Sequence, residues 1–132
     1  LIVGDVSPEQ HKIMTAMQAC NDAAVAACAS RKTCTAANDA ALNALKDAGL
    51  GTAIRHRIGH GMGLEGHEAP WLSPGDPTQI QTNMVFSNEP GVYRPDIDGY
   101  RTINTMIVTE TGVDIPSRFQ TDTPINARVI AI

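Results

Sequence analysis

A glycine-spaced group of histidines over residues 56–71 is the feature that most constrains this chain. Three of its four histidines, His56, His60 and His67, fall within twelve positions there. Imidazole binds metal ions and transfers protons near neutral pH, so such a group exceeds what folding alone requires. The intervening glycines allow the backbone to approach closely or to turn sharply around the rings. The segment is therefore predicted to form a functional site.

Length and composition indicate a globular protein with one domain. The 132 residues suffice for a single core, and 42% apolar against 18% charged residues argues against disorder. The net charge of −4 provides no basic surface, so nucleic acid is not expected as a partner. The apolar runs are too short to cross a bilayer, so no membrane partner is expected either.

The beginning of the chain and its cysteines carry two further expectations. Residues 1–5 have neither an initiator methionine nor the pattern of a leader peptide, and they resemble the end of a strand. This predicts a chain cut from a longer protein. Cys20, Cys28 and Cys34 are odd in number and lack CxxC spacing. They are expected to be buried thiols in a reducing compartment, and the protein is expected to be cytoplasmic.

A first helix is predicted over about residues 8–30. Ser7 and Gln10 have the spacing of a capping box, and Pro8 suits the first helical position. Apolar residues then recur at helical intervals, which indicates that one face of this helix is buried.

A second helix is predicted over about residues 36–48. Thr33 or Thr35 is expected to cap its beginning, and Gly49 or Gly51 to end it.

The region of residues 53–132 is predicted to be strand-rich and to carry the site. A short strand over residues 53–58 would place His56, Ile58 and His60 on one face. Other strands are expected from β-branched and aromatic runs, with a loop at 73–77 between them: 84–87, 92–93, 100–109 and 127–132. Two helices followed by antiparallel strands indicate a single α+β domain over residues 1–132.

Several side chains in this region are candidates for chemistry. His60, between two glycines, has room to bind a divalent metal ion together with a substrate. His67 lies too far along the chain for a helical ligand pair, so it is expected to act as a proton donor or substrate contact. Glu89 sits in an apolar strand, where a carboxylate requires a cation or a partner. Arg101 can hold a carboxylate or a developing anion. His56 is either a structural histidine or a third catalytic candidate.

Two familiar motifs are excluded. Glu68 follows His67, but the position that HExxH requires for its second histidine holds Trp71, and Pro70 would break the helix. The glycines around His60 lack the lysine and the spacing of a phosphate loop.

Three motifs together resemble the pita-bread enzymes, which include methionine aminopeptidase, aminopeptidase P, prolidase and creatinase. The motifs are His-Arg-x-Gly-His-Gly-x-Gly-Leu-x-x-His-Glu-x-Pro, then Met-Val-Phe-Ser-x-Glu-Pro-Gly-Val-Tyr, then Gly-Tyr-Arg with Ile-Val-Thr-Glu-Thr-Gly. The resemblance covers essentially the whole chain and is nearest to the prolidase, aminopeptidase P and creatinase branch. It implies the carboxy-terminal portion of a pita-bread fold, with two helices packed on a curved, mostly antiparallel sheet.

The resemblance also implies a hydrolase of the Xaa-Pro peptidase type. In such peptidases two divalent ions, held by two aspartates, one histidine and two glutamates, activate a hydroxide that attacks the peptide carbonyl. His60 matches the ligand histidine, and Glu89 matches the first glutamate. His67 matches the second histidine, which contacts substrate, and Arg101 matches the arginine beside the last ligand. A peptide or small amide is therefore the expected substrate.

The sequence departs from the family in two places. The second metal glutamate falls on Ile103, which cannot bind a cation. The two aspartates normally lie on a hairpin whose end resembles residues 1–4, and Asp5 occupies neither position. Manganese, cobalt, zinc or iron is therefore expected only if that hairpin is present, as a missing amino-terminal segment or a companion chain. The exposed sheet edge predicts a homo-oligomer.

These departures leave two alternatives to an Xaa-Pro peptidase. Creatinase is a member of the family that works without metal and uses its histidine as acid and base. A metal-independent hydrolase of a small amide or amidine is the first alternative. A pita-bread module that binds a partner without catalysis is the second.

Overall fold

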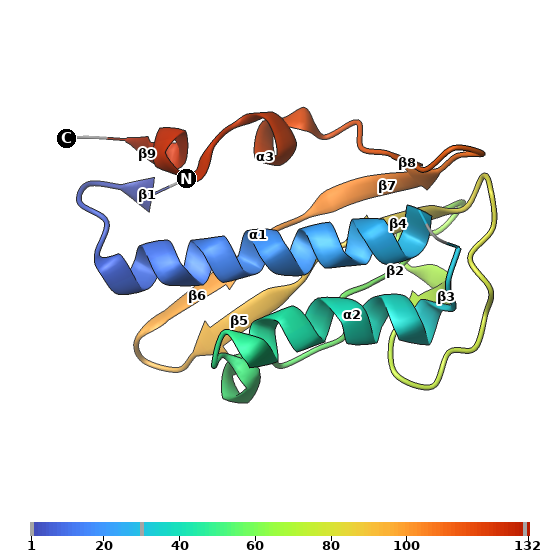
Figure 1. Ribbon diagram of the computed structural model, residues 1–132, viewed down its shortest axis with the longest axis horizontal. Coiled ribbons are helices and arrows are strands. Elements are labelled where there is room, and N and C mark those ends of the chain that lie inside the picture. The colour runs from blue at the N-terminus through green and yellow to red at the C-terminus, as the bar shows by residue number, and fades with distance from the viewer. Residues whose placement is uncertain (1, 30, 131) are drawn as a thin grey trace.

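Two long helices, α1 (Pro8–Ala29) and α2 (Cys34–Asp47), lie side by side across one face of an antiparallel sheet (Figure 1). The structure is a computed structural model that describes residues 2–29, 31–130 and 132. The main sheet has the strand order β3-β2-β4-β7-β8, with bounds Glu68–Leu72, Gly59–Gly61, Val85–Asn88, Asn104–Val108 and Val113–Asp114. This arrangement confirms the α+β expectation.

Two small sheets and short helices complete the fold. A hairpin of β5 (Gly91–Arg94) and β6 (Asp98–Arg101) extends from the main sheet beneath the beginning of α1 (Figure 1). Near the two ends of the chain, β1 (Ile2–Val3) pairs in parallel with β9 (Val129–Ile130). The remaining helical turns are η1, α3 and η2, at Gly51–Ala53, Arg118–Asp122 and Ile125–Arg128.

The beginning of α1 is fixed by the expected capping box. The Ser7 backbone N–H donates to Gln10 Oε1 at 2.8 Å, and the Gln10 N–H donates to Ser7 Oγ at 3.2 Å. Both contacts satisfy donors that the first helical turn leaves unpaired. The helix runs to Ala29, and residue 30 of the expected span lies outside the described residues.

Thr33 rather than Thr35 caps α2, so this helix begins two residues before the expected start. Thr33 Oγ1 accepts the N–H of Ala36 at 3.2 Å. Gly49 ends the helix in the left-handed region, at φ +82°, which a glycine adopts without strain. The Leu50 N–H then donates back to the Leu45 carbonyl at 2.9 Å, and this bond closes the last turn.

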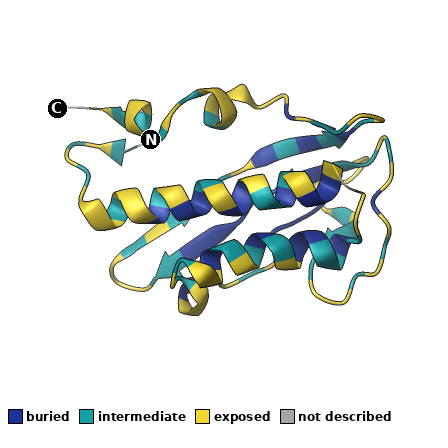
Figure 2. Cartoon of the chain, in the orientation of Figure 1, coloured by how far each residue is buried: buried dark blue, intermediate teal, exposed yellow. Residues whose placement is uncertain are grey.

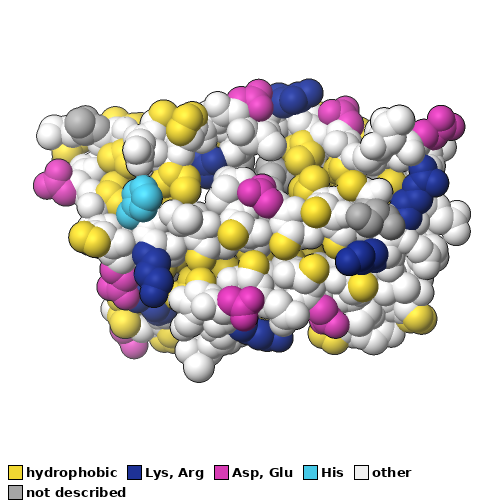
Figure 3. Space-filling model, viewed as in Figure 1, with side chains coloured by type: hydrophobic (Ala, Val, Ile, Leu, Met, Phe, Trp, Pro, Cys, Tyr) yellow, Lys and Arg dark blue, Asp and Glu magenta, His cyan; other side chains and the backbone are white. Residues whose placement is uncertain are grey.

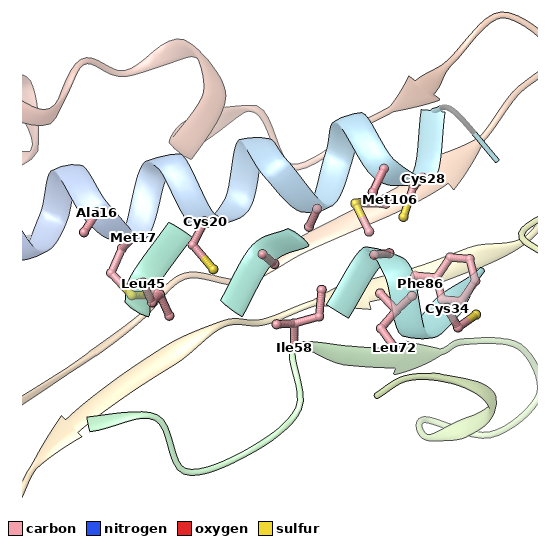
Figure 4. Close-up of a cluster of buried hydrophobic side chains, with 14 of the residues drawn as sticks. Ala16, Met17, Cys20, Cys28, Cys34, Leu45, Ile58, Leu72, Phe86 and Met106 are labelled. Atoms are coloured by element: carbon pink, nitrogen blue, oxygen red, sulfur yellow. The ribbon is translucent and has the colours of Figure 1, made fainter. Parts of the chain in front are cut away.

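The hydrophobic core lies between the two helices and the sheet. Buried positions fall on the side of each helix that faces the other helix and the sheet (Figure 2). Met17, Cys20 and Leu45 lie toward one end of this core, and Phe86 and Met106 of β4 and β7 lie toward the other (Figure 4). Phe86 is 0% exposed, so its whole ring contributes apolar burial.

The three cysteines are buried in this core, as expected, and the structure gives them no disulfide. Burial raises the pKa of the Cys20 and Cys28 thiols to about 12 and that of Cys34 to about 11. The neutral thiol is therefore the stable form at physiological pH, which makes these side chains unreactive packing groups.

The expected strand over residues 53–58 is wrong. Residues 51–53 form the 3-10 turn η1, and only Ile54 makes an isolated bridge, to Val92. The Arg55 guanidinium donates to the backbone carbonyls of Thr52 and Ile54, which turns the segment back on itself. His56 therefore does not share a strand face with Ile58 and His60.

The expected strand over residues 100–109 is two strands in different sheets. It breaks at residues 102–103, between β6 and β7. The break lies opposite a bend in the partner strand, where Pro90 interrupts pairing because it has no N–H to donate. The Pro90 carbonyl still accepts the Thr102 N–H at 3.2 Å, so the two bends are held together.

On the helix side of the molecule, acidic and basic side chains are interspersed and form no large patch of one sign (Figure 3). Among the described residues, no helix combines the length and apolar character needed to cross a membrane.

Phe86→Ala is expected to reduce the free energy of unfolding by about 3–5 kcal/mol, because it opens a cavity in the core. Phe119→Ala is the matched control, since that ring is 50% exposed in α3, and it should change stability by less than about 1 kcal/mol. Urea denaturation followed by circular dichroism measures both. Equal losses in the two variants would contradict this assignment of the core.

Candidate active site

The candidate site lies on the sheet face that points away from the helices. Side chains alternate between the two faces of a strand, and Phe86 and Asn88 of β4 point toward the helices and are fully buried. Ser87 therefore points to the opposite face, and His60 is its registered partner on β2. On the other side of β2, Trp71 is the registered partner of His60.

His60 is held where two neighbouring strands approach its own strand very closely. A Cβ atom on Gly59 would lie 1.9 Å from the Ser87 carbonyl oxygen, and one on Gly61 would lie 2.7 Å from the Ala69 carbonyl oxygen. Both distances are far below van der Waals contact, so only glycine fits at either position. The two glycines thus allow β4 and β3 to pack closely against β2 on either side of His60.

Glu89 reaches His60 at the point where β4 ends. Its backbone N–H donates to the Ile58 carbonyl at 2.6 Å, and Pro90 follows it directly. Glu89 Oε1 then lies 3.1 Å from His60 Nε2, with side-chain exposures of 14% and 5%. The carboxylate is therefore held largely out of water against the ring.

The hydrogen bonding of His60 leaves a lone pair directed at this carboxylate. His60 Nδ1 lies 2.9 Å from the Gly61 carbonyl oxygen, which can only accept, so Nδ1 carries the proton. In a neutral ring, Nε2 then presents a lone pair to Glu89 Oε1. Two lone pairs 3.1 Å apart repel unless a positive charge lies between them. That charge is either a proton on Nε2 or a cation bound to both atoms.

The separation of these two atoms fits a divalent ion. Zinc holds nitrogen and oxygen ligands at about 2.0–2.1 Å, so two ligands on a tetrahedral ion lie roughly 3.3 Å apart. A bond from the second ring nitrogen to a backbone carbonyl is also the usual way in which a ligand histidine is oriented. His60 and Glu89 therefore have the donor atoms and the spacing of a metal site, and the Gly61 carbonyl orients the His60 ring.

His67 comes to the same place from the turn after β2. Its ring centroid lies 4.0 Å from that of His60, and the two planes are inclined by 33°. The possible ligand atoms of His60, His67 and Glu89 all lie within 4.8 Å of one another. His67 is exposed whereas His60 is buried, so one imidazole faces the protein and the other faces the solvent.

Arg101 binds the other oxygen of the Glu89 carboxylate. Its guanidinium donates to Glu89 Oε2 from β6, which brings a third segment of the chain to the site. The bond to Glu89 is the main cause of a raised pKa for Arg101, and Tyr93 contributes a smaller part. The arginine therefore keeps its charge and partly neutralises the carboxylate.

His56, the remaining catalytic candidate, lies outside the group formed by His60, His67 and Glu89. Its Nδ1–H donates to the Arg57 carbonyl at 2.6 Å, so Nε2 accepts from the Tyr93 hydroxyl at 3.1 Å. This geometry gives His56 a supporting contact with Tyr93.

The sequence interpretation missed three side chains near the site. Tyr93 donates to His56 from β5, and Trp71 lies beside His60 with ring centroids 6.4 Å apart. The Arg57 guanidinium stacks on the Trp71 ring at 4.4 Å from its centroid. The proximity of Tyr93 to Glu89 in the second motif was the one available signal. The stack of Arg57 on Trp71 depends on strand pairing, so no local pattern indicated it.

Ile103 lies where the β4–β7 register, if continued, would place a residue opposite Glu89. The last registered pair is Asn88 with Asn104, so Glu89 and Ile103 are the next positions along. Ile103 is 49% exposed and offers no donor atom. The described residues therefore fit one cation at His60 and Glu89, and they do not supply a carboxylate for a second.

Comparison with known proteins gives the family. A sequence profile of Metallopeptidase family M24 matches residues 1–110. The chain is 34% identical to the Xaa-Pro dipeptidase of Pyrococcus furiosus over 112 residues, which is 85% of this chain and 32% of that protein. The chain therefore belongs to the M24 metallopeptidases, the family with the pita-bread fold.

Solved structures agree with this assignment. Dipeptidase PepE from Mycobacterium ulcerans superposes with a TM-score of 0.87 at 35% identity, over 98% of this chain and 34% of that one. The N-terminal domain of FACT complex subunit SPT16 from chickpea superposes with a TM-score of 0.82 at 15% identity, over 98% of this chain and 33% of that one, a likeness of fold alone. The chain spans about a third of the length of the curated relatives it matches.

His60→Ala and Glu89→Gln are each expected to weaken Co²⁺ binding by more than about 100-fold, since replacing even an outer-shell partner of a metal ligand typically weakens binding by 10–100-fold. His11→Ala is the control, because His11 is an exposed histidine on α1 that contacts Asn126 instead of the site. Isothermal titration calorimetry measures all three variants. Unchanged affinity in H60A would exclude this site for the ion.

Proposed function

We propose that this chain is the carboxy-terminal part of the catalytic domain of a hydrolase of the Xaa-Pro peptidase type. Its substrate would be a peptide or a small amide. The observation that carries the proposal is the convergence of His60, His67 and Glu89 within 4.8 Å on the open face of the sheet. The similarity to Xaa-Pro dipeptidases supports the same reaction class.

His60 and Glu89 would hold the divalent cation, which can be manganese, cobalt, zinc or iron. When bound, such an ion polarises a carbonyl and lowers the pKa of a coordinated water. The Gly61 carbonyl keeps His60 in the tautomer whose Nε2 is free to bind. Arg101 holds Glu89 by its other oxygen, so the carboxylate presents Oε1 in a fixed direction.

His67 and Arg101 would act on the substrate side of this pair. His67 is exposed beside His60, so its ring can donate a proton or a hydrogen bond to an oxyanion that forms at the attacked carbonyl. Arg101 has 43% of its side chain exposed, so it retains donors for a substrate carboxylate while it binds Glu89.

The complete reaction would need a further segment of protein. The family pattern places two aspartate ligands on a hairpin before the residues described here, and this chain corresponds to about a third of its relatives. We propose that such a segment, in the same or a companion chain, covers the open face at His60. A homo-oligomer is the assembly expected from the free edges of the sheet.

His67→Ala is expected to lower kcat/KM for an Ala-Pro dipeptide by about 10²–10⁴-fold, the usual contribution of a positioned acid or base. The measurement is release of proline by the purified full-length protein, with the proposed aspartate-bearing segment present, after incubation with Mn²⁺ or Co²⁺. His11→Ala serves as the control and should leave the rate unchanged. Loss of activity in both variants, or in neither, would contradict the role of His67.

A metal-independent, creatinase-like reaction is the second candidate. Ile103 in place of a carboxylate and the neutralisation of Glu89 by Arg101 favour it, because both reduce the negative charge available to cations. Activity that survives a chelator would support this alternative and exclude the metallopeptidase. Absence of activity on both peptides and small amides would leave the non-catalytic binding module as the remaining candidate.

In the protein that carries the proposed aspartate hairpin, Ile103→Glu is expected to raise the number of Co²⁺ ions bound per chain from one to two, because it restores a carboxylate beside Glu89. Ile103→Gln is the matched control, since it has the same length without the charge, and it should still bind one ion. Calorimetry and elemental analysis give the stoichiometry. A second ion in the wild-type protein would contradict the assignment of Ile103 as the limiting residue.

A further inference from the structure

Three buried asparagines form a hydrogen-bonded group directly behind the candidate site. They are Asn21 of α1, Asn88 at the end of β4 and Asn104 at the beginning of β7, and each is at most 1% exposed. Asn21 Oδ1 accepts from Asn88 Nδ2 at 2.8 Å and from Asn104 Nδ2 at 3.1 Å. One helix side chain thus binds two strands at once.

The two strand asparagines lie close in the sequence to two residues of the candidate site. Asn88 and Asn104 are registered opposite each other, and both point toward the helices. Glu89 directly follows Asn88, and Arg101 comes three residues before Asn104. Since side chains alternate along a strand, Glu89 leaves the opposite face from the one that Asn21 binds.

This group is more polar than packing requires. An amide in the core loses its bonds to water, and Asn88 Oδ1 has no hydrogen-bond partner among the described residues. Apolar side chains of similar size would fill the same space without that loss. The amides instead orient the strands, because each hydrogen bond to Asn21 fixes where a strand end lies relative to α1.

A second helix asparagine supports the same carboxylate from another side. Asn38 of α2 is 0% exposed, and its Oδ1 accepts the Ile58 backbone N–H at 3.3 Å. The Ile58 carbonyl in turn accepts the Glu89 N–H at 2.6 Å. Asn21 of α1 therefore binds the side chain of the residue before Glu89. Asn38 of α2 binds Ile58, the residue whose carbonyl accepts the Glu89 N–H.

We propose that Asn21 is a positioning residue for the candidate active site, through which α1 sets the direction of Glu89 relative to His60. It acts through Asn88 and Asn104 and touches neither substrate nor ion. The inference rests on the proposed function, because it concerns the same cation-binding pair. It goes further in assigning part of the site's geometry to a helix on the other side of the sheet.

Co²⁺ is the probe for the test, since its visible absorption reports the geometry of its ligands. Asn21→Leu keeps the approximate size but removes the acceptor, and it should weaken Co²⁺ binding by about 10–100-fold and alter the spectrum. Asn21→Asp retains an acceptor oxygen and should restore most of the affinity and the wild-type spectrum. An N21L protein with wild-type affinity and spectrum would overturn the proposal.

Ala16→Gly is the control that separates an effect on the site from a loss of stability alone. Ala16 is buried in the middle of α1, and its replacement weakens the helix without touching the asparagines. A16G should melt earlier but bind Co²⁺ as the wild type does. If N21L does not fold, Asn104→Ala takes its place, since it removes one of the two bonds, and the same direction of effect is expected. Equal Co²⁺ binding in A16G and N21L at equal loss of stability would also overturn the proposal.

A wild-type protein that binds no Co²⁺ would refute the cation site of the proposed function but would leave the geometry testable. The ¹⁵N chemical shift of His60 Nε2 in the metal-free protein, at fixed pH, reports its contact with Glu89. This chemical shift should change in N21L and keep its wild-type value in A16G. An unchanged shift in N21L would overturn the positioning role independently of any metal.

Discussion

The Glu89 carboxylate, shared between His60 and Arg101, is the contact on which the rest of the candidate site depends. It joins β2, the end of β4 and β6, three segments that are separate in the sequence. A carboxylate with so little access to water is stable there only because positive charge or hydrogen-bond donors surround it. Arg101 supplies one charge permanently at one carboxylate oxygen, and His60 Nε2 lies beside the other.

The fold supports this contact by making one side of the sheet rigid and leaving the other open. The helices cover the sheet face that carries Phe86 and Met106. The opposite face, with His60 and Trp71, retains access to solvent. Catalytic and binding groups need such a division, because a packed layer fixes the strands while the open layer receives the ligand.

Helix boundaries were predictable from the sequence because their determinants are local. The cap at Ser7 and the glycine stop at Gly49 each act within a few residues, and both are present in the structure. The strand over residues 53–58 was mispredicted because a single side chain, Arg55, binds the backbone carbonyls of Thr52 and Ile54 there. The break within residues 100–109 depends on the partner strand at Pro90, which no window of local sequence contains.

For the site, the sequence indicated which residues to consider, and the structure adds how they are related. Spacing of the motifs singled out His60, His67 and Glu89, and the structure places them together. Their catalytic and metal-binding roles stay predictions. Spacing could not reveal that His56 contacts Tyr93, or that a helix asparagine lies behind Glu89, since both contacts join segments far apart in the chain.

The close approach of strands at Gly59 and Gly61 limits how this site can change over time. Groups at the rim, such as the side chain at Ile103, face open space and can be exchanged for others without moving the backbone. A methyl group at either glycine would instead force two strands apart. Substitution at the rim can therefore alter the groups that line such a site, while the close packing of the strands around Gly59 and Gly61 stays the same.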